Sequence, residues 1–236
     1  MNLDALKGRT FKGFMIDEEA TRLYELARIA AQSGPCLEIG SYCGRSAAYL
    51  GLGCLEAGGI LFSVDHHQGS EEQQPGGEYY DPELLDPITG RIDTFPFFLR
   101  TIRELSLDNT VVPIVSRSDV AARCWKTPLS LIFIDGGHTF ESAVTDYNSW
   151  TSFLIFGGYL VIHDIFFDPL SGGQAPRCIY QMALASGLFR ELPMIGTLGI
   201  LQRSSANCIT DIASAKWQNI ISGRERRPHP PPGKQG

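Results

Sequence analysis

Polar side chains follow five apolar stretches of the chain. These side chains belong to Glu38, Asp65, Ser118-Asp119, Asp135 and His163-Asp164. Carboxylates accept hydrogen bonds from hydroxyl and ammonium groups and ligate divalent cations, and imidazole exchanges protons near neutral pH. If the apolar stretches are strands of one parallel sheet, their carboxyl ends meet at one edge. We therefore expect the five groups to face a common crevice.

A glycine turn follows the first apolar stretch, in Leu37-Glu38-Ile39-Gly40-Ser41-Tyr42-Cys43-Gly44-Arg45-Ser46. Gly40 and Gly44 let the backbone approach a ligand closely, and the helix that opens at Ser46 offers free N–H groups. Tyr42 stands where a pyrophosphate-binding G-x-G-x-x-G motif has its second glycine, which disfavours a dinucleotide. The alternative is an ordinary strand-to-helix turn with a solvated glutamate, because short glycine motifs recur by chance.

Asp65 ends the second apolar stretch, in the position from which an acid holds both hydroxyls of a ribose. The alternative is a cap for the loop that follows, a common role for Asp. Ser118-Asp119 is placed to border an adenine ring, or else to cap a short helix.

Asp135-Gly136-Gly137-His138 and His163-Asp164 are the runs suited to catalysis. Carboxylates and an imidazole from adjacent strand ends are suitable ligands for a divalent cation such as Mg²⁺, and we expect Asp135, Asp164 and His163 to form that site. His138 is the expected general base, because its ordinary pKa is close to neutrality. Asp135 and His163 are further catalytic candidates. The alternative is a pair of hydrogen-bonded structural histidines.

The periodicity of apolar residues predicts an alternation of strands and helices, and hence a Rossmann-like, doubly wound α/β fold with a mostly parallel sheet. We expect helices at 17–31, 46–57, 94–105, 120–125, 140–153 and 174–186, and strands at 36–39, 60–65, 111–115, 129–134 and 159–162. Segments 189–192 and 197–202 are expected to pair as an antiparallel hairpin at the sheet edge. Gly157-Gly158 is expected to be a turn before the fifth strand, and residues 1–15 a loosely attached arm.

One domain is expected over residues 1–222, with a lid inserted at 66–93. That segment is rich in Gly, Pro, Glu, Gln and Tyr, and a loop so long within a compact domain is often functional, although a plain surface excursion is the alternative. Residues 223–236 are Pro-rich and charged, so we expect a disordered tail.

Composition excludes several classes of function. The chain has 236 residues, a net charge of -6 and a sequence pI near 5.4, which argues against a nucleic-acid partner. The six cysteines form no C-x-x-C pair or zinc spacing, which indicates reduced thiols. No secretion signal is visible, and no apolar run has the roughly 18 residues of a membrane span. We expect a cytoplasmic protein without a membrane partner.

The chain resembles the class I S-adenosylmethionine-dependent methyltransferases over residues 17–203. The resemblance depends on the glycine turn, on Val64-Asp65, and above all on Ile132-Phe133-Ile134-Asp135-Gly136-Gly137-His138 and Gly157-Gly158-Tyr159-Leu160-Val161-Ile162-His163-Asp164. The last two runs are similar to a branch that includes metal-dependent O-methyltransferases of natural-product sugars. This likeness implies a seven-stranded sheet with an antiparallel C-terminal hairpin.

The resemblance also implies roles for individual residues. The methionine part of the cofactor would lie near Glu38, Gly40 and Ser41, the ribose near Asp65, and the adenine near Ser118 and Asp119. Further cofactor-binding residues are expected at Gly44, Ser46 and Asp135. Asp135 and Asp164 would ligate the metal, and His138 would be the base. The chain departs from these relatives at His163, where they tend to carry an acid.

The expected function is S-adenosylmethionine-dependent methyl transfer to a hydroxyl of a small-molecule acceptor, with Mg²⁺ or another divalent cation as an expected second cofactor. Two alternatives stay open: a nicotinamide-dependent oxidoreductase, and a non-catalytic cofactor-binding protein with the same fold. The sequence does not identify the acceptor. A homo-oligomer formed through the aromatic-rich helix at 94–105 also stays open.

Overall fold

Seven strands of the described residues form one sheet in the order β3-β2-β1-β4-β5-β7-β6. The computed structural model describes residues 3–6 and 8–204, so the predicted tail at 223–236 lies outside the described part. The strands are β1 (Cys36–Ile39), β2 (Leu61–Asp65), β3 (Val111–Val115), β4 (Leu129–Ile134), β5 (Leu154–Ile162), β6 (Phe189–Ile195) and β7 (Leu198–Arg203). The first five run parallel, and β7 pairs antiparallel with both β5 and β6. The predicted fold class is confirmed.

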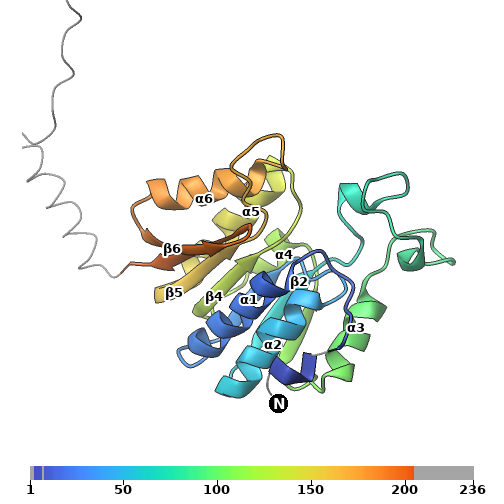
Figure 1. Ribbon diagram of the computed structural model, residues 1–236, viewed down its shortest axis with the longest axis horizontal. Coiled ribbons are helices and arrows are strands. Elements are labelled where there is room, and N and C mark those ends of the chain that lie inside the picture. The colour runs from blue at the N-terminus through green and yellow to red at the C-terminus, as the bar shows by residue number, and fades with distance from the viewer. Residues whose placement is uncertain (1–2, 7, 205–236) are drawn as a thin grey trace, which may run out of the picture.

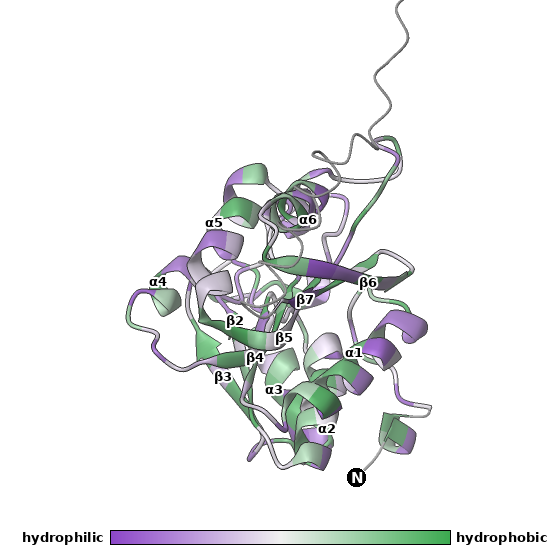
Figure 2. Ribbon diagram, turned by 90° about the vertical axis from the view of Figure 1, so that its left-hand side faces the viewer, coloured by the Kyte–Doolittle hydropathy of each residue, from purple (hydrophilic) through white to green (hydrophobic). Residues whose placement is uncertain are grey.

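Helices cover both faces of this sheet (Figures 1 and 2). One face carries α1 (Asp17–Ala30), α2 (Arg45–Ala57) and α3 (Phe95–Glu104), and the other carries α4 (Ser118–Ala122), α5 (Phe140–Trp150) and α6 (Ala175–Ala185). Short 3₁₀ helices occur at Leu3–Leu6, Glu71–Gln73, Pro82–Leu84 and Thr151–Phe153. The sheet is therefore sandwiched between two apolar layers, as its buried parallel strands require. No helix of the described residues combines the length and apolar character needed to span a membrane.

The carboxyl ends of four strands stop level with one another. Ile39 is paired with Val64 and with Ile134, and Ile134 is paired with Ile162. The residues that come next in each strand therefore form a row, which consists of Gly40, Asp65, Asp135 and His163. This register brings residues from distant parts of the sequence to one edge of the sheet.

Strand β5 begins earlier than the sequence indicates. We expected Gly157-Gly158 to turn the chain before a strand at Tyr159, but the strand runs from Leu154 and contains both glycines. The pairing with β4 shifts register between Leu129 and Leu131, and Gly157 has a φ of 80°. A Cβ on Gly158 would lie 2.8 Å from the Ser130 carbonyl oxygen. The glycines thus accommodate a bulge inside the strand.

Other differences are local. The short helix expected at 120–125 begins at Ser118, and the helix expected at 140–153 ends at Trp150, where a 3₁₀ turn continues it. The prediction of a loosely attached N-terminal arm is wrong. Leu6, Phe11 and Met15 are buried in the same apolar cluster as residues of α1 and α2. The arm is thus part of the fold.

Residues 66–93 stand away from the helices at one end of the sheet (Figure 1). We call this segment the lid. It has a small apolar core of its own, in which Leu84 and Ile92 pack with Cys43 of the glycine turn. Its root is His67, a buried histidine with a φ of 59° whose Nδ1 lies 2.8 Å from Thr94 Oγ1. The lid is therefore anchored at both of its ends.

Candidate active site

A cleft of about 1210 Å³ lies over the carboxyl ends of the strands. Its walls are the glycine turn, the ends of β2, β4 and β5, the start of α4, the lid, and residues 12–15 of the N-terminal arm. Open α/β sheets bind ligands at this edge. Of the residues predicted from the sequence, Gly40, Ser41, Ser46, Asp65, Ser118, Asp119, Asp135, His138, His163 and Asp164 line the cleft.

Glu38 lies behind the glycine turn and is completely buried. Its Oε2 accepts a hydrogen bond from Ser63 Oγ at 2.6 Å, and Ser63 Oγ also contacts Ser41 Oγ. Glu38 Oε1 accepts no hydrogen bond from the described residues. Burial raises the pKa of Glu38 to about 7, although the hydroxyls of Ser46, Ser63 and Ser41 oppose the rise. A buried carboxylate oxygen without a donor is a site for a ligand N–H or O–H group.

Asp65 organises the glycine turn from the end of β2. Its Oδ2 accepts hydrogen bonds from the backbone N–H groups of Ser41 and Tyr42, both at 2.9 Å, and its Oδ1 accepts one from His67 at 2.7 Å. Tyr42 has a φ of 47°, a conformation that a non-glycine residue adopts only when its surroundings hold it there. The carboxylate therefore ties the turn and the root of the lid together.

Gly40 joins the two halves of the site. Its φ is 86°, and a Cβ at this position would lie 2.1 Å from the Asp135 carbonyl oxygen. The glycine turn and the end of β4 thus touch backbone to backbone, which only glycine permits. Gly44, with a φ of 90°, precedes the first turn of α2 and packs against Phe98 and Thr101.

Ser118 and Asp119 begin α4 on the cleft wall. Ser118 Oγ accepts a hydrogen bond from Trp150 Nε1 at 2.7 Å. Asp119 is paired with Arg117 at 3.0 Å and with Arg123 at 3.2 Å. Both side chains therefore have structural partners as well as positions on the cleft.

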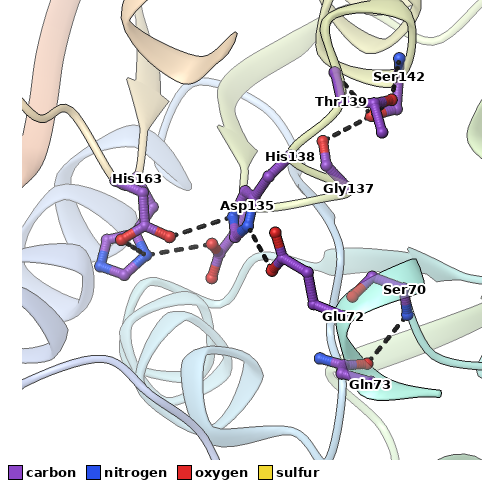
Figure 3. Close-up of polar contacts among 10 residues, drawn as sticks. Ser70, Glu72, Gln73, Asp135, Gly137, His138, Thr139, Ser142 and His163 are labelled. Atoms are coloured by element: carbon purple, nitrogen blue, oxygen red, sulfur yellow. Dashed lines mark hydrogen bonds and ion pairs between the residues drawn. The ribbon is translucent and has the colours of Figure 1, made fainter. Parts of the chain in front are cut away.

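Three ligand groups converge at the ends of β4 and β5. Asp135, His138 and Asp164 each bring one ligand atom within 4.8 Å of the others. His138 Nε2 lies 3.1 Å from Asp164 Oδ2, and His138 Nδ1 lies 3.2 Å from Glu72 Oε2 of the lid. Figure 3 shows Glu72 reaching from the lid to the histidine. Asp164 has a φ of 59°, a conformation that a non-glycine residue adopts only when its surroundings hold it there.

His163 lies on the other side of Asp135 and deeper in the fold (Figure 3). Its Nδ1 is 3.1 Å from Asp135 Oδ1, and its Nε2 is 2.9 Å from Glu19 Oε2 on α1. Glu19 Oε1 accepts hydrogen bonds from the backbone N–H and the hydroxyl of Thr197, in the turn between β6 and β7. Both nitrogens of His163 are therefore engaged by carboxylates. The expected ligand set included His163, but the group of ligand atoms contains His138 in its place.

A comparison with known protein families identifies residues 37–165, more than half of the chain, as a methyltransferase domain. The chain belongs to this methyltransferase family. The matched segment begins at β1 and ends directly after His163-Asp164. The family match favours methyl transfer over the nicotinamide-dependent oxidoreductase that the sequence left open.

Solved structures share the fold of this methyltransferase. Cofactor-bound Rv0187 from MTB is 16% identical, with a TM-score of 0.58 over 86% of this chain and 88% of that one. The O-methyltransferase NovP is 17% identical, with a TM-score of 0.59 over 80% and 79%. An O-methyltransferase from Bacillus cereus in complex with SAH is 16% identical, with a TM-score of 0.56 over 81% and 83%.

The two histidines of the methyltransferase differ in what surrounds them. The hydrogen bond to Asp164 is the main cause that raises the pKa of His138 to about 9, helped by Glu72 and opposed by burial. For His163 burial acts against the charged form, but Asp135, Glu19 and Asp164 outweigh it and raise the pKa to about 11. In both cases the neighbouring carboxylates favour the protonated imidazole.

Two residues of the site were missed in the sequence. Glu19 looked like one of three acids in the first turn of a helix, where the dipole favours them. The available signal was its spacing, because Glu19 falls on the buried stripe of α1 with Leu23, Leu26 and Ala30. Glu72 was expected only as part of the lid composition, and nothing local indicated its contact with His138.

Proposed function

We propose that the protein transfers a methyl group from S-adenosylmethionine to a hydroxyl of a small molecule, with a divalent cation bound beside the acceptor. The proposal depends on one observation: Gly40, two residues after the buried Glu38, touches the backbone of Asp135, and Asp135 forms a group of ligand side chains with His138 and Asp164. A donor site and a site for activating a hydroxyl are thus adjacent. The O-methyltransferase names of several similar structures agree with this proposal.

The residues present fit the methyl donor. Glu38 Oε1 is buried without a hydrogen-bond donor, and an ammonium group of the donor's methionine part would supply one. Gly40, Ser41 and Ser46 line the cleft where this part would lie, whereas Gly44 does not line it and would act by shaping the turn. Asp65 uses three of the roughly four acceptor sites of a carboxylate on N–H groups, which leaves one for a ribose hydroxyl. Ser118 and Asp119 would border the adenine.

The residues also fit a divalent cation. Asp135 and Asp164 offer carboxylate oxygens from adjacent strand ends, the ligand type that Mg²⁺ and Mn²⁺ prefer. The bound cation would lower the pKa of an acceptor hydroxyl. His163 has no free nitrogen, so we assign it to holding Asp135 in place rather than to the cation.

His138 is the proposed base. Its Nε2 is oriented by Asp164, so Nδ1 is the nitrogen that faces the lid and the cleft. Displacement of Glu72 by an acceptor removes one of the smaller causes of the raised pKa, and a cation ligated by Asp164 would oppose the largest one. Once Nδ1 has released its proton to solvent, it can take the proton of the acceptor hydroxyl. The acceptor oxygen then forms a bond to the methyl carbon while the carbon–sulfur bond breaks, and the sulfonium leaves as a neutral thioether. The site must hold oxygen, carbon and sulfur in line.

The test is a titration of the purified protein with S-adenosylmethionine, followed by mass spectrometry of methylated products in a mixture of hydroxylated small molecules. Donor binding with methylation that requires Mg²⁺ or Mn²⁺ supports the proposal. No donor binding at high micromolar concentration contradicts it. Donor binding without turnover, unchanged in His138→Ala, would favour the non-catalytic binding protein.

A further inference from the structure

Three aromatic rings in contact with one another line the same cleft as the group of Asp135, His138 and Asp164. Phe14 of the N-terminal arm lies between Tyr42 of the turn, at a ring-centroid distance of 5.4 Å, and Tyr79 of the lid, at 5.1 Å. We call Phe14, Tyr42 and Tyr79 the aromatic wall. Tyr79 is close to the catalytic groups, because its backbone N–H donates to the carbonyl of Glu72 at 3.0 Å and the side chain of Glu72 contacts His138 at 3.2 Å.

The aromatic wall is open to the cleft. Phe14 is 59% exposed and Tyr79 is 43% exposed, although both belong to segments that pack firmly elsewhere. Lys12, two residues before Phe14, forms ion pairs with Asp81 at 2.5 Å and with Glu83 at 2.6 Å. These pairs fasten the arm to the lid, so the exposed rings are held in place rather than left on a free end. Exposed, fixed aromatic faces are favourable surfaces for stacking a planar ligand.

The charges of the cleft select against an anion. Nine carboxylate side chains line it among the described residues, against three permanently charged cations: Lys12, Arg45 and Arg117. All three cations are already paired, Lys12 as above, Arg45 with Asp17 at 2.6 Å and Arg117 with Asp119 at 3.0 Å. The two histidines that line the cleft, His138 and His163, are likewise engaged by carboxylates. Every cationic side chain of the cleft among the described residues therefore already has a carboxylate partner, which disfavours a phosphate or a carboxylate on the ligand.

The inner carboxylates have the donor and the divalent cation as partners, but the outer ones do not. Glu71 and Glu78 on the lid and Glu141 on α5 have no cationic partner among the described residues and line the cleft around the aromatic wall. Their field acts on whatever part of the acceptor projects from the catalytic groups. It favours a positive charge there and disfavours a negative one.

We propose that the acceptor is an aromatic hydroxyl compound without negative charge, which stacks on the aromatic wall with its hydroxyl toward Asp135, His138 and Asp164, and that a cationic arm on the ring improves it. This inference rests on the proposed function, because it names the acceptor class of the same site. It excludes acceptors that carry a phosphate or a nucleotide.

Four probes of matched size test the proposal. Three are catechols that carry an aminoethyl, a methyl or a carboxymethyl arm, and the fourth is the saturated cyclohexanediol. Each is assayed for methylation with S-adenosylmethionine and Mg²⁺, and for binding by calorimetry with S-adenosylhomocysteine and Mg²⁺ present. We expect kcat/KM to fall in the order aminoethyl, methyl, carboxymethyl, with about a tenfold difference between the charged arms at low salt that shrinks at high salt. The cyclohexanediol should be the poorest acceptor.

Two sets of variants assign the selectivity to residues. Glu78→Lys should bring the carboxymethyl probe level with the aminoethyl one or ahead of it, whereas Glu104→Lys, the same charge change on the far end of α3, should leave the order unchanged. Tyr79→Ala should raise KM for the catechols about tenfold. Tyr79→Phe should keep KM at the wild-type value, since stacking of the ligand needs only the aromatic ring.

The outcomes separate the two proposals. Absence of donor binding would refute the proposed function itself. Donor binding together with preference for the carboxymethyl arm, equal use of the cyclohexanediol, or no methylation of any catechol would overturn the acceptor class and leave methyl transfer standing.

Discussion

Two histidines of this methyltransferase lie on opposite sides of Asp135, each between two carboxylates, and their settings differ. His163 is 6% exposed and is fixed by Glu19 and Asp135, which belong to an internal helix and a strand end. His138 is 32% exposed and contacts Asp164 and the lid residue Glu72. The same chemical arrangement therefore favours a buried, fixed imidazolium in one place and a proton site accessible from the cleft in the other. Burial and the exposure of Glu72, rather than the ion pairs themselves, distinguish the two roles.

The largest expected effect comes from breaking the buried contact between Glu19 and His163. Glu19→Ala leaves His163 with an unmatched buried nitrogen and removes the acceptor for Thr197, so we expect the free energy of unfolding to fall by about 3–5 kcal/mol. The matched control is Glu18→Ala, an exposed neighbour on α1, which should change it by less than about 0.5 kcal/mol. Chemical denaturation measures both. If both variants lower the free energy of unfolding equally, the buried contacts of Glu19 do not stabilise the fold as proposed.

The pH dependence of the Glu19 effect follows from the two pKa shifts. The pKa of Glu19 is lowered from 4.5, because the hydrogen bonds from His163 and Thr197 outweigh burial, so its stabilisation is lost on acidification. The pKa of His163 is raised from 6.5 to about 11, so its stabilisation is complete below 6.5 and is lost as the pH rises toward 11. The difference between the wild type and Glu19→Ala should therefore be greatest between pH 4.5 and 6.5.

Substitution of the more exposed histidine, His138, should affect turnover instead of stability. His138→Asn removes the proposed base, and we expect kcat to fall by about 10²–10³-fold while the melting temperature changes little. The lost activity should recover partly as the pH rises, because the acceptor then loses its proton without help. If kcat is normal at saturating Mg²⁺ and only the metal requirement increases, His138 is a ligand and not the base.

Glu38 differs from the two histidines, because it is a buried carboxyl group without a counter-ion. Its pKa is raised from 4.5 to about 7, so the folded state holds a proton that the unfolded state releases, and the free energy of unfolding falls as the pH rises through this range. Glu38→Gln should abolish that dependence and be more stable above pH 7 by about 3 kcal/mol, since the shift spans about 2.5 pKa units and each unit corresponds to about 1.4 kcal/mol. It should also bind S-adenosylmethionine more weakly. A variant that unfolds at the same denaturant concentration as the wild type at pH 8 would contradict this.

The smallest effect is expected at the lid. Glu72→Gln weakens a half-exposed contact, and such pairs contribute about 0–1 kcal/mol. The pKa of His138, followed by NMR, should decrease toward its ordinary value while stability stays within about 0.5 kcal/mol. Glu71→Gln, the neighbouring lid position, is the control. A pKa unchanged by Glu72→Gln would show that Asp164 alone sets the protonation of His138.

Much of the fold and part of the site were readable from the sequence. The sheet, its helices and the row of polar residues at the strand ends follow from periodicity and from the geometry of parallel strands. The contacts that were missed are non-local. Glu19 meets His163 across 144 positions of sequence, and Glu72 meets His138 across 66. No local propensity encodes such pairs, and burial decides them only once the layers have packed. The buried N-terminal arm was missed because short apolar segments without periodicity carry little signal.

The Glu19 carboxylate also has a consequence for the order in which the molecule is assembled. Its two oxygens bind His163 and Thr197. The contact between helix α1 and the β6–β7 turn therefore joins residues that are 178 positions apart in the sequence. Loop closure over such a distance is slow and comes late in folding. During synthesis the donor cradle of β1, β2 and α2 can form long before this contact. The Glu19–His163 contact that holds Asp135 is therefore complete only when the last hairpin has closed the sheet.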